Sequence, residues 1–358
     1  MAMVKLGDVA IEKRETWTGS TQGVPIIGLE HLVPGEITLS SWDSDTDNTF
    51  SKMFRKDQVL LGRRRVYLKK AVIAPFDGIC SGDITVIEAI PGKISPRLLP
   101  FIIQNERFFD YAIQGSAGSL SPRVKWEHLK DYEFNLSDYE EQESLANKLW
   151  SALKLKESYH ALLLATDEMV KSRFIEMFGG NGASVKWPKA KLTEIVDPEC
   201  PISYGIVQPD DDVKDGVPIV RPVDLNVGLY VKREGLKCTT PEISNAYKRT
   251  VLRGEELLLC VRGTTGLMGI ATEELKGANV TRGITPLFFK PGINRIYVLG
   301  AFLSDDIQTY IKEHTIGSTL KGINMEKVRK IEIPVPPIAL QNKYEQIFKQ
   351  ADKSKYLN

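Results

Sequence analysis

Several features that would narrow the function are missing or scarce in this 358-residue chain. No run of eighteen apolar residues occurs, so the sequence predicts no transmembrane helix and no membrane partner. The four cysteines include no C-x-x-C pair, which argues against a zinc site or a disulfide framework. This cysteine usage favours reduced thiols and a cytoplasmic location. None of the four histidines is spaced as a metal-binding pair, so no metal site is predicted.

Catalytic motifs are missing as well. The sequence has neither the Asn/Asp-Pro-Pro-aromatic motif of a methyltransferase nor a Gly-x-Ser-x-Gly nucleophile elbow. The glycine-rich stretch 263–266 lacks the Gly-Lys-Ser/Thr ending of a phosphate-binding loop and is interpreted as a tight turn. Aspartates at 43–47 and 210–212 lie in polar loops and are interpreted as solvated charge. We therefore predict a protein that is not an enzyme and has no cofactor of its own.

An internal repeat is present. The stretches GSAGSLSPRVKWEHLKDYEF, from position 115, and GSTLKGINMEKVRKIEIPVP, from position 317, share one pattern. Aligning Gly118 with Gly317 gives an offset of 199, which also places Gln142 on Gln341. Upstream matches keep their order at similar offsets: Leu60-Leu61 with Leu258-Leu259, and Asp83-Ile84-Thr85 with Gly283-Ile284-Thr285. The chain is therefore predicted to be a tandem duplication whose loops have diverged.

Each copy contains short β-rich runs separated by Pro- and Gly-containing turns, followed by an amphipathic helical stretch. This pattern predicts an α+β fold with two tandem, strand-rich α/β domains. We expect the first domain over residues 1–137 and the second over residues 181–336.

A long helix is predicted between the copies, over residues 138–180. Residues 138–178 contain no Gly or Pro, and 41 residues of helix rise about 60 Å. A second, shorter helix is predicted over residues 337–358, and we expect the two to pack as an antiparallel coiled coil. The predicted seam comprises Leu145, Leu149, Tyr159, Leu163, Val170, Phe174, Tyr344 and Phe348. The long helix is interpreted as a spacer; the alternative is a core helix of one large domain.

Charge is unevenly distributed although the formal net charge is only +1. The stretch Lys52–Lys70 holds eight basic residues and one acidic residue. Such a stretch is typical of a surface that faces nucleic-acid phosphates, and its arginines are suited to reading guanine edges. The alternative is a solvated face of a strand pair. The corresponding stretch of the second copy is less basic.

Several of these motifs, in this order, resemble the specificity (S) subunits of type I restriction-modification systems. The segments that carry the resemblance are Leu60–Lys70 leading into Ala74–Ser81, Trp187–Leu192, Val217–Arg221, Arg262–Gly266 and Ile331–Pro337. The resemblance covers nearly the whole chain and includes the family's target-recognition domains. The chain departs from the family pattern in its short second helix.

The resemblance implies a non-catalytic subunit that reads a bipartite sequence in double-stranded DNA, one half-site per domain. It also implies two methyltransferase (modification) subunits and restriction/translocase subunits as partners. S-adenosylmethionine, ATP and Mg are then expected only on those partners. Because the two copies differ in their polar loops, we expect an asymmetric target.

Candidate DNA-contacting residues follow from these patterns. In the first domain they are Thr21, Gln22, Arg63, Arg64, Arg65, Lys69, Lys70, Ser119 and Arg123. In the second domain they are Arg221, Arg262, Thr264, Thr265, Lys321 and Asn324. For Arg64 and Lys70, pairing with nearby carboxylates is an alternative. At the level of the whole protein, the rival classes are a lone-chain enzyme and a structural adaptor that uses its duplicated domains to hold proteins.

Overall fold

The computed structural model describes residues 2–179, 187–318 and 321–356. The chain divides into two compact units, Met1–Ser158 and Tyr159–Asn358, which we call unit 1 and unit 2. Helix α5 (Tyr139–Phe178) crosses this division, so its first half belongs to unit 1 and its second half to unit 2. The predicted boundary between residues 180 and 181 lies outside the described residues. No helix in the described ranges is long and apolar enough to cross a bilayer.

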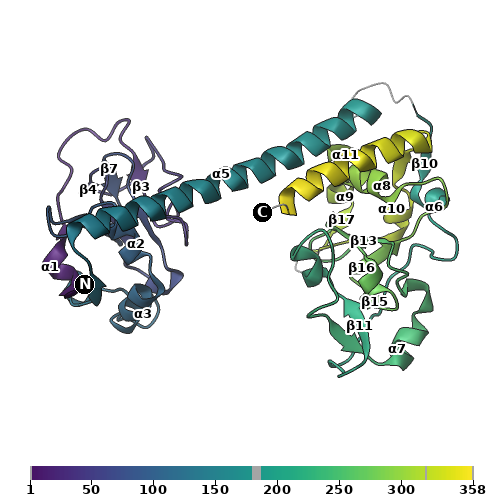
Figure 1. The fold of residues 1–358 in the computed structure, drawn as a ribbon, viewed down its shortest axis with the longest axis horizontal. Coiled ribbons are helices and arrows are strands. Elements are labelled where there is room, and N and C mark those ends of the chain that lie inside the picture. The colour runs from purple at the N-terminus through teal and green to yellow at the C-terminus, as the bar shows by residue number, and fades with distance from the viewer. Residues whose placement is uncertain (1, 180–186, 319–320, 357–358) are drawn as a thin grey trace. The chain divides into compact units, whose positions relative to one another are not determined.

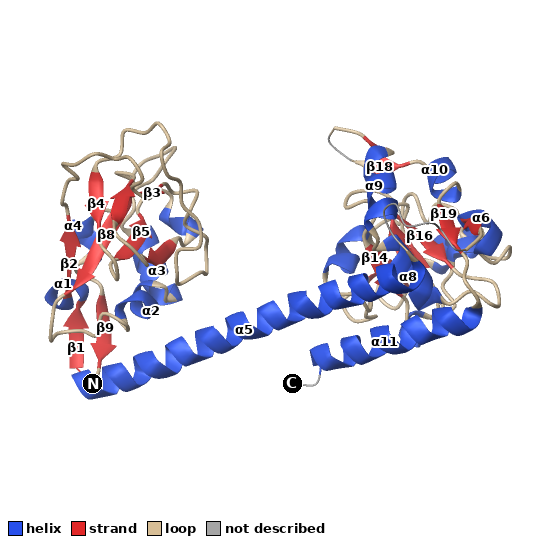
Figure 2. Ribbon diagram, turned by 90° about the horizontal axis from the view of Figure 1, so that it is seen from above, coloured by secondary structure: helices blue, strands red, loops and turns tan. Residues whose placement is uncertain are grey.

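Unit 1 is built around a four-stranded antiparallel sheet in the order β2-β8-β5-β6, and Figure 2 shows β8 between β2 and β5. Its strands are β2 (Ala10–Lys13), β8 (Ile84–Ala89), β5 (Val59–Gly62) and β6 (Ala71–Ile73). A second sheet has the order β3-β7-β4, with β3 (Ile26–Ile27), β7 (Gly78–Cys80) and β4 (Lys52–Phe54). A third pairs β1 (Ala2–Lys5) with β9 (Glu133–Leu136).

Strand β5 explains why the core of unit 1 has two sides. All four of its residues, Val-Leu-Leu-Gly, are buried, as expected of a strand covered on both faces. Val59 and Leu61 join the core beneath α2 (Leu99–Ile103) and α3 (Glu106–Gln114). Leu60 points the other way, into a core shared with Ile27 and Phe54 of the second sheet. The short helices α1 (Leu6–Val9), η1 (Val66–Leu68) and α4 (Trp126–Leu129) complete the unit.

Unit 2 repeats the arrangement. Its central sheet has the order β14-β13-β16, and a second sheet has the order β12-β11-β15. The strands are β10 (Lys189–Lys191), β11 (Val217–Val220), β12 (Lys237–Thr239), β13 (Leu257–Cys260), β14 (Met268–Ile270), β15 (Asn279–Val280), β16 (Ile284–Leu287), β17 (Thr315–Ile316), β18 (Gly322–Ile323) and β19 (Glu332–Pro334). Two further pairs join β10 to β19 and β17 to β18.

The helices of unit 2 besides the end of α5 are α6 (Leu192–Ile195), α7 (Pro241–Ala246), α8 (Arg295–Phe302), α9 (Asp305–Glu313), α10 (Met325–Arg329) and α11 (Ile338–Tyr356). Short 3-10 turns are η2 (Pro222–Asn226), η3 (Lys248–Thr250) and η4 (Glu273–Leu275). Seven of the eight residues of α8 are buried, so this helix is the centre of the unit's larger core. Together the separate sheets and helices confirm the predicted α+β class.

Strand register confirms the internal repeat residue by residue. In unit 1, Leu61 lies opposite Thr85 and Gly62 opposite Ile84. In unit 2, Leu259 lies opposite Thr285 and Cys260 opposite Ile284. The β5–β8 and β13–β16 pairs are therefore structural equivalents. By this register the residue two positions after each strand, Arg64 or Arg262, occupies the same place in its unit.

A buried glutamine joins each unit to the helix that follows it. In unit 1 the Gln142 side-chain oxygen accepts a hydrogen bond from the Ser95 amide at 2.8 Å, and its nitrogen donates to the Ser137 carbonyl at 2.9 Å. Gln341 repeats both bonds, to the Asn294 amide at 2.8 Å and the Pro336 carbonyl at 2.7 Å. The two glutamines are 199 positions apart, so the joint is duplicated along with the domain.

The second half of α5 lies antiparallel to α11 and over α8 within unit 2 (Figure 1). The Phe174 and Tyr344 rings meet edge-on with centroids 5.2 Å apart, and Val170 and Phe348 are buried in the same core. Gly300 of α8 permits this close packing, because a Cβ there would lie 2.6 Å from Phe174 and 2.7 Å from the Tyr344 hydroxyl. The predicted antiparallel helix pair is therefore present over this part of α5.

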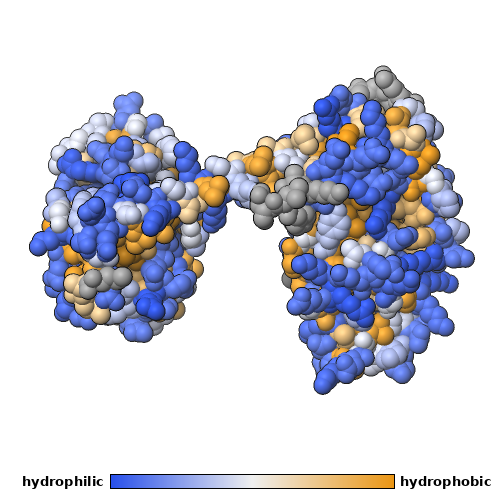
Figure 3. Space-filling view, in the orientation of Figure 1, coloured by the Kyte–Doolittle hydropathy of each residue, from blue (hydrophilic) through white to orange (hydrophobic). Residues whose placement is uncertain are grey.

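The remaining predicted seam residues are less covered. Leu149 packs half-buried against the core of unit 1, and Tyr159 and Leu163 are also half-buried. Leu145 is 47% exposed. Outside the predicted seam, Leu155, Leu162 and Leu164 are 70%, 60% and 54% exposed. Figure 3 shows apolar side chains at the surface along this part of α5.

Candidate nucleic-acid interface

The basic residues of unit 1 are presented by the loop that follows β5. Two residues in the left-handed backbone region, Arg65 at φ 52° and Lys69 at φ 53°, bracket the single turn η1 and bend the chain sharply. The segment 116–124 lies against this loop: Arg64 forms a β-bridge with Arg123, and the Arg65 amide donates to the Pro122 carbonyl at 2.7 Å. The predicted basic segment and the predicted polar turn, far apart in the sequence, are thereby brought together.

Asp83 holds the two segments to each other. Its carboxylate accepts hydrogen bonds from Arg123 Nε at 2.7 Å and Arg123 Nη2 at 3.3 Å. Arg64 Nη1 reaches the same carboxylate at 3.5 Å, while Arg64 Nε donates to the Ser121 hydroxyl at 2.6 Å. The Arg123 guanidinium is the main cause that lowers the pKa of Asp83 below its usual value. For Arg64, the alternatives were a contact with DNA and a pair with a nearby carboxylate. The structure shows the pair, with Asp83, a partner that was not predicted.

Arg63 and Arg65 differ from these paired arginines. Arg65 is exposed, and its side chain extends from the bend of the loop. Arg63 is half-buried, and its Nε atom is buried with no hydrogen-bond partner in the described part of the chain. It lines a surface cleft of about 670 Å³ together with Lys52, Lys125 and Trp126. The Lys52 side chain is largely buried, which lowers the pKa of its ammonium group; this group donates a hydrogen bond to the Ile84 carbonyl at 2.9 Å and lies 3.5 Å from a Glu12 carboxylate oxygen.

The other candidates of unit 1 have varied surroundings. Lys69 pairs with Glu106 of α3. Lys70 donates to the Leu29 carbonyl at 2.7 Å, so it has a backbone acceptor and not the carboxylate that the alternative envisaged. Ser119 is exposed on the same segment as Arg123, whereas Thr21 and Gln22 are exposed on a separate loop. That loop is held through the Gly23 amide, which donates to Asp45 at 2.7 Å.

Unit 2 presents Arg262, Thr264 and Thr265 on the loop between β13 and β14. Arg262 forms a β-bridge with Gly322, and the Gly263 amide donates to the Lys321 carbonyl at 2.9 Å, so Lys321 lies beside this loop. Thr264 is exposed, and the Thr265 hydroxyl lies 3.1 Å from that of Thr315. These residues form one surface, as the first unit's arginines do.

Two candidates of unit 2 have evident structural contacts. Arg221 makes a two-pronged pair with Asp224, with Nε–Oδ2 and Nη2–Oδ1 distances of 3.1 and 2.8 Å. Asn324 caps α10, because its side-chain oxygen accepts from the Glu326 amide at 3.0 Å. Sequence inspection missed Tyr204 and Arg282, which lie beside Arg262. The Arg262 and Arg282 guanidinium groups stand 5.5 and 5.8 Å from the centre of the Tyr204 ring.

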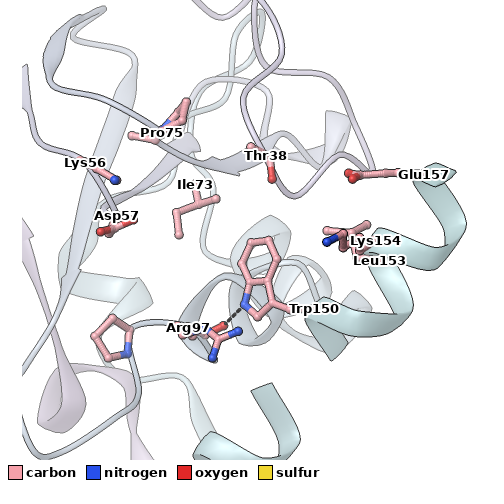
Figure 4. A pocket seen from close by; sticks show the side chains of 12 residues that line it. Thr38, Lys56, Asp57, Ile73, Pro75, Arg97, Trp150, Leu153, Lys154 and Glu157 are labelled. Carbon is pink, nitrogen blue, oxygen red and sulfur yellow. Dashed lines mark hydrogen bonds between the residues drawn. The ribbon is translucent and has the colours of Figure 1, made fainter. Parts of the chain in front are cut away.

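Unit 1 also contains a larger cleft, apart from the arginine loop. This cleft, of about 800 Å³, lies between α5 and residues 38, 56–57 and 73–75 (Figure 4). Trp150 forms one wall, held by a hydrogen bond from its Nε1 to the Arg97 carbonyl at 2.9 Å. Charged side chains of both signs line the rim, including Lys56, Asp57 and Glu157. Within the described ranges, no three His, Cys, Asp or Glu side chains are grouped as a metal site.

Comparison with known proteins agrees with the resemblance that the motifs predict. Residues 185–358 match the family described as "Type I restriction modification DNA specificity domain", which assigns most of unit 2 to that class of domain. The chain is also 27% identical, over 323 residues, to the type I restriction enzyme EcoBI specificity subunit of Escherichia coli. That alignment covers 78% of this chain and 67% of the EcoBI subunit. The chain is thus similar to the specificity subunits of type I restriction-modification systems.

Solved structures support the fold. One, from work on the complex assembly and conformational transition of the type I R-M system, superposes with a TM-score of 0.57 at 19% identity. It covers 99% of this chain and 92% of its own. The type I restriction-modification S subunit of M. genitalium superposes with a TM-score of 0.59 at 14% identity, covering 99% and 90% of the two chains. Both likenesses extend over both units.

Proposed function

We propose that this chain reads a bipartite, asymmetric sequence in double-stranded DNA, with one half-site per unit, and carries no catalytic activity itself. One observation carries the proposal: both units present arginines at the equivalent position after β5 and β13. Arginine guanidinium groups on exposed loops bind phosphates and guanine edges in two-pronged fashion. The difference between the two loops favours different half-sites, because Arg64 has a carboxylate partner and Arg262 has an aromatic one.

We also propose that α5 docks the methyltransferase subunits, with restriction subunits joining the same complex. The exposed leucines Leu155 and Leu162 support this part of the proposal, since they lie seven residues apart on one face of α5, and exposed apolar side chains on one helix face are typical of an interface with another protein. In this arrangement S-adenosylmethionine, ATP and Mg belong to the partner subunits. The length of α5 then determines the gap between the half-sites.

Selection from random duplex DNA tests the DNA-reading part. The full chain is used alone and together with the methyltransferase subunit encoded beside it. Two short fixed blocks separated by a fixed gap are the expected result. No enrichment in either preparation, with folding verified by circular dichroism, would contradict the proposal and favour the protein-holding adaptor.

Substitution of the exposed leucines tests the docking part. Leu162→Glu is expected to abolish co-purification with the methyltransferase subunit without changing the melting temperature, because this side chain makes little contact within the chain. Val223→Glu, at a site of unit 2 that is 56% exposed, serves as the control and is expected to leave co-purification intact. Unchanged binding by the Leu162 variant would rule out this face of α5 as the docking surface.

A further inference from the structure

The two equivalent arginines differ in how their charge is compensated. Arg64 shares the Asp83 carboxylate with Arg123, so the positive charge of this cluster is partly neutralised. The residue equivalent to Asp83 by strand register is Gly283. A side chain there is sterically excluded, because a Cβ would lie 2.4 Å from Pro222 Cγ. The loop of unit 2 therefore lacks the carboxylate that its counterpart has.

Arg262 has a different neighbour. It shares the Tyr204 ring with Arg282, and no ion pair of either arginine is found among the described residues. Arg282 is exposed and Arg262 half-buried. The Arg282 amide donates to the Ile206 carbonyl at 2.7 Å, which fixes its backbone beside the segment that carries Tyr204. Two guanidinium groups are thus gathered on one ring without a compensating carboxylate.

This arrangement is suited to an anionic ligand. A guanidinium group over an aromatic face is attracted by the ring's negative face, while the N–H groups at its edge stay free to donate. Because both guanidinium groups lie within 5.8 Å of the same ring centre, their charges add to the local positive potential, which favours a bound anion. Lys321, whose backbone contacts the neighbouring Gly263, adds a third positive side chain near the loop.

We propose that Arg262 and Arg282, positioned by Tyr204, form a phosphate-binding site that anchors unit 2 on the backbone of duplex DNA. This proposal rests on the proposed DNA-reading function and assigns different roles to the two units. Unit 2 supplies the salt-dependent, sequence-independent anchor through this site. In unit 1 the Asp83-held arginines are fixed in orientation and contribute less to that anchor.

The test is the salt dependence of DNA binding by the full chain, measured by fluorescence anisotropy with a random-sequence duplex and with the selected target. Arg282→Gln and Arg262→Gln are each expected to weaken binding to both duplexes alike. Each is expected to reduce the slope of log K against log salt by about 0.9, the change for one lost phosphate contact. Arg282→Lys keeps the charge and is expected to keep the slope.

Arg253→Gln is the matched control. Arg253 also lies over an aromatic ring, Phe288, at 4.7 Å, but it is paired with Glu199 at 3.1 Å, so its replacement is expected to leave the slope unchanged. Tyr204 is tested by Tyr204→Phe, which keeps the ring and normal binding, and Tyr204→Leu, which weakens binding. Melting curves establish that each variant is folded.

The outcomes separate the anchor from the wider proposal. If the wild-type chain binds DNA and the Gln variants keep its slope, the phosphate site is overturned and the DNA-reading function stands. A loss confined to the selected target assigns these arginines to base reading and overturns the anchor equally. If the wild-type chain binds neither duplex at any salt concentration, the proposed function fails together with this site.

Discussion

In unit 1, a single carboxylate determines which of the candidate arginines are fixed by an ion pair. Asp83 gathers Arg64 and Arg123 from two distant segments, whereas Arg65 extends alone from a left-handed bend. A dense run of basic residues can be recognised from the sequence alone, so the arginines themselves were predictable. Asp83 was not, because an aspartate next to a predicted strand carries no local sign of partners 19 and 40 positions away. Tyr204 was missed for the same reason.

Replacing Asp83 measures how much its ion pairs contribute to the stability of the fold. Asp83→Asn is expected to lower the free energy of unfolding by about 1 kcal/mol at pH 7, because charge-assisted hydrogen bonds to two arginines are lost. Urea unfolding of the full chain measures the change. Asp47→Asn, in an exposed loop, is the control and is expected to stay within about 0.5 kcal/mol of wild type.

The same pair predicts a pH dependence. Because the folded-state pKa of Asp83 is lowered, its contribution to stability is fully present above the unfolded-state pKa of about 3.9. The contribution is lost as the pH falls through the lower, folded-state pKa. The stability difference between wild type and Asp83→Asn is therefore expected to be constant from pH 5 to pH 7 and to shrink on acidification below about pH 4. A difference that persists unchanged at the lowest pH would contradict the ion pair.

At the scale of elements, α5 is one helix with two different environments. Its last turns bury Val170, Phe174 and Phe178 in the core with α8 and α11, whereas its middle exposes leucines. The apolar stripe predicted Val170, Phe174, Tyr344 and Phe348 as seam residues, and all four are buried. Spacing alone does not tell which turns of a long helix find a partner, because that depends on neighbours supplied elsewhere in the chain. Leu145 fits the same pattern and remains largely exposed.

Gly300 tests the packing of the three helices. Gly300→Ala is expected to destabilise unit 2 by about 1–3 kcal/mol, because its methyl group would overlap Phe174 and Tyr344. Thermal unfolding followed by circular dichroism measures the loss. Gly228→Ala is the matched control: its added Cβ meets no atom within 4 Å, and its backbone is not left-handed. Equal stability of the two variants would mean that α5, α8 and α11 are less closely packed than the structure indicates.

At the scale of the whole molecule, the repeat was the most predictable feature. Two copies with the same order of motifs fix the fold class and the position of both helices, since each motif supports the reading of its counterpart. The strand registers then place Arg64 and Arg262 at the same position. The bases that each unit reads cannot be predicted from the repeat, because they depend on loop side chains in which the copies differ.

The proposed link between helix length and target spacing has a direct test. Inserting seven residues, two full turns, into the exposed middle of α5 lengthens the helix by about 10 Å. We expect the selected gap to grow by about three base pairs, at 3.4 Å each, with both half-sites unchanged. Seven alanine substitutions at exposed positions of the same segment control for composition. An unchanged gap would show that the length of α5 does not determine the spacing of the half-sites.

The two buried glutamines bear on how the gene could diverge. Gln142 and Gln341 make the same pair of bonds 199 positions apart, although neither lies near the arginine loops. Each satisfies a backbone amide, that of the buried Ser95 or of the half-buried Asn294, so a mutation in one copy is not compensated by the other. Selection on these joints is therefore independent of selection on the loops. Substitutions in the arginine loops can therefore change what each unit binds while both joints keep their hydrogen bonds.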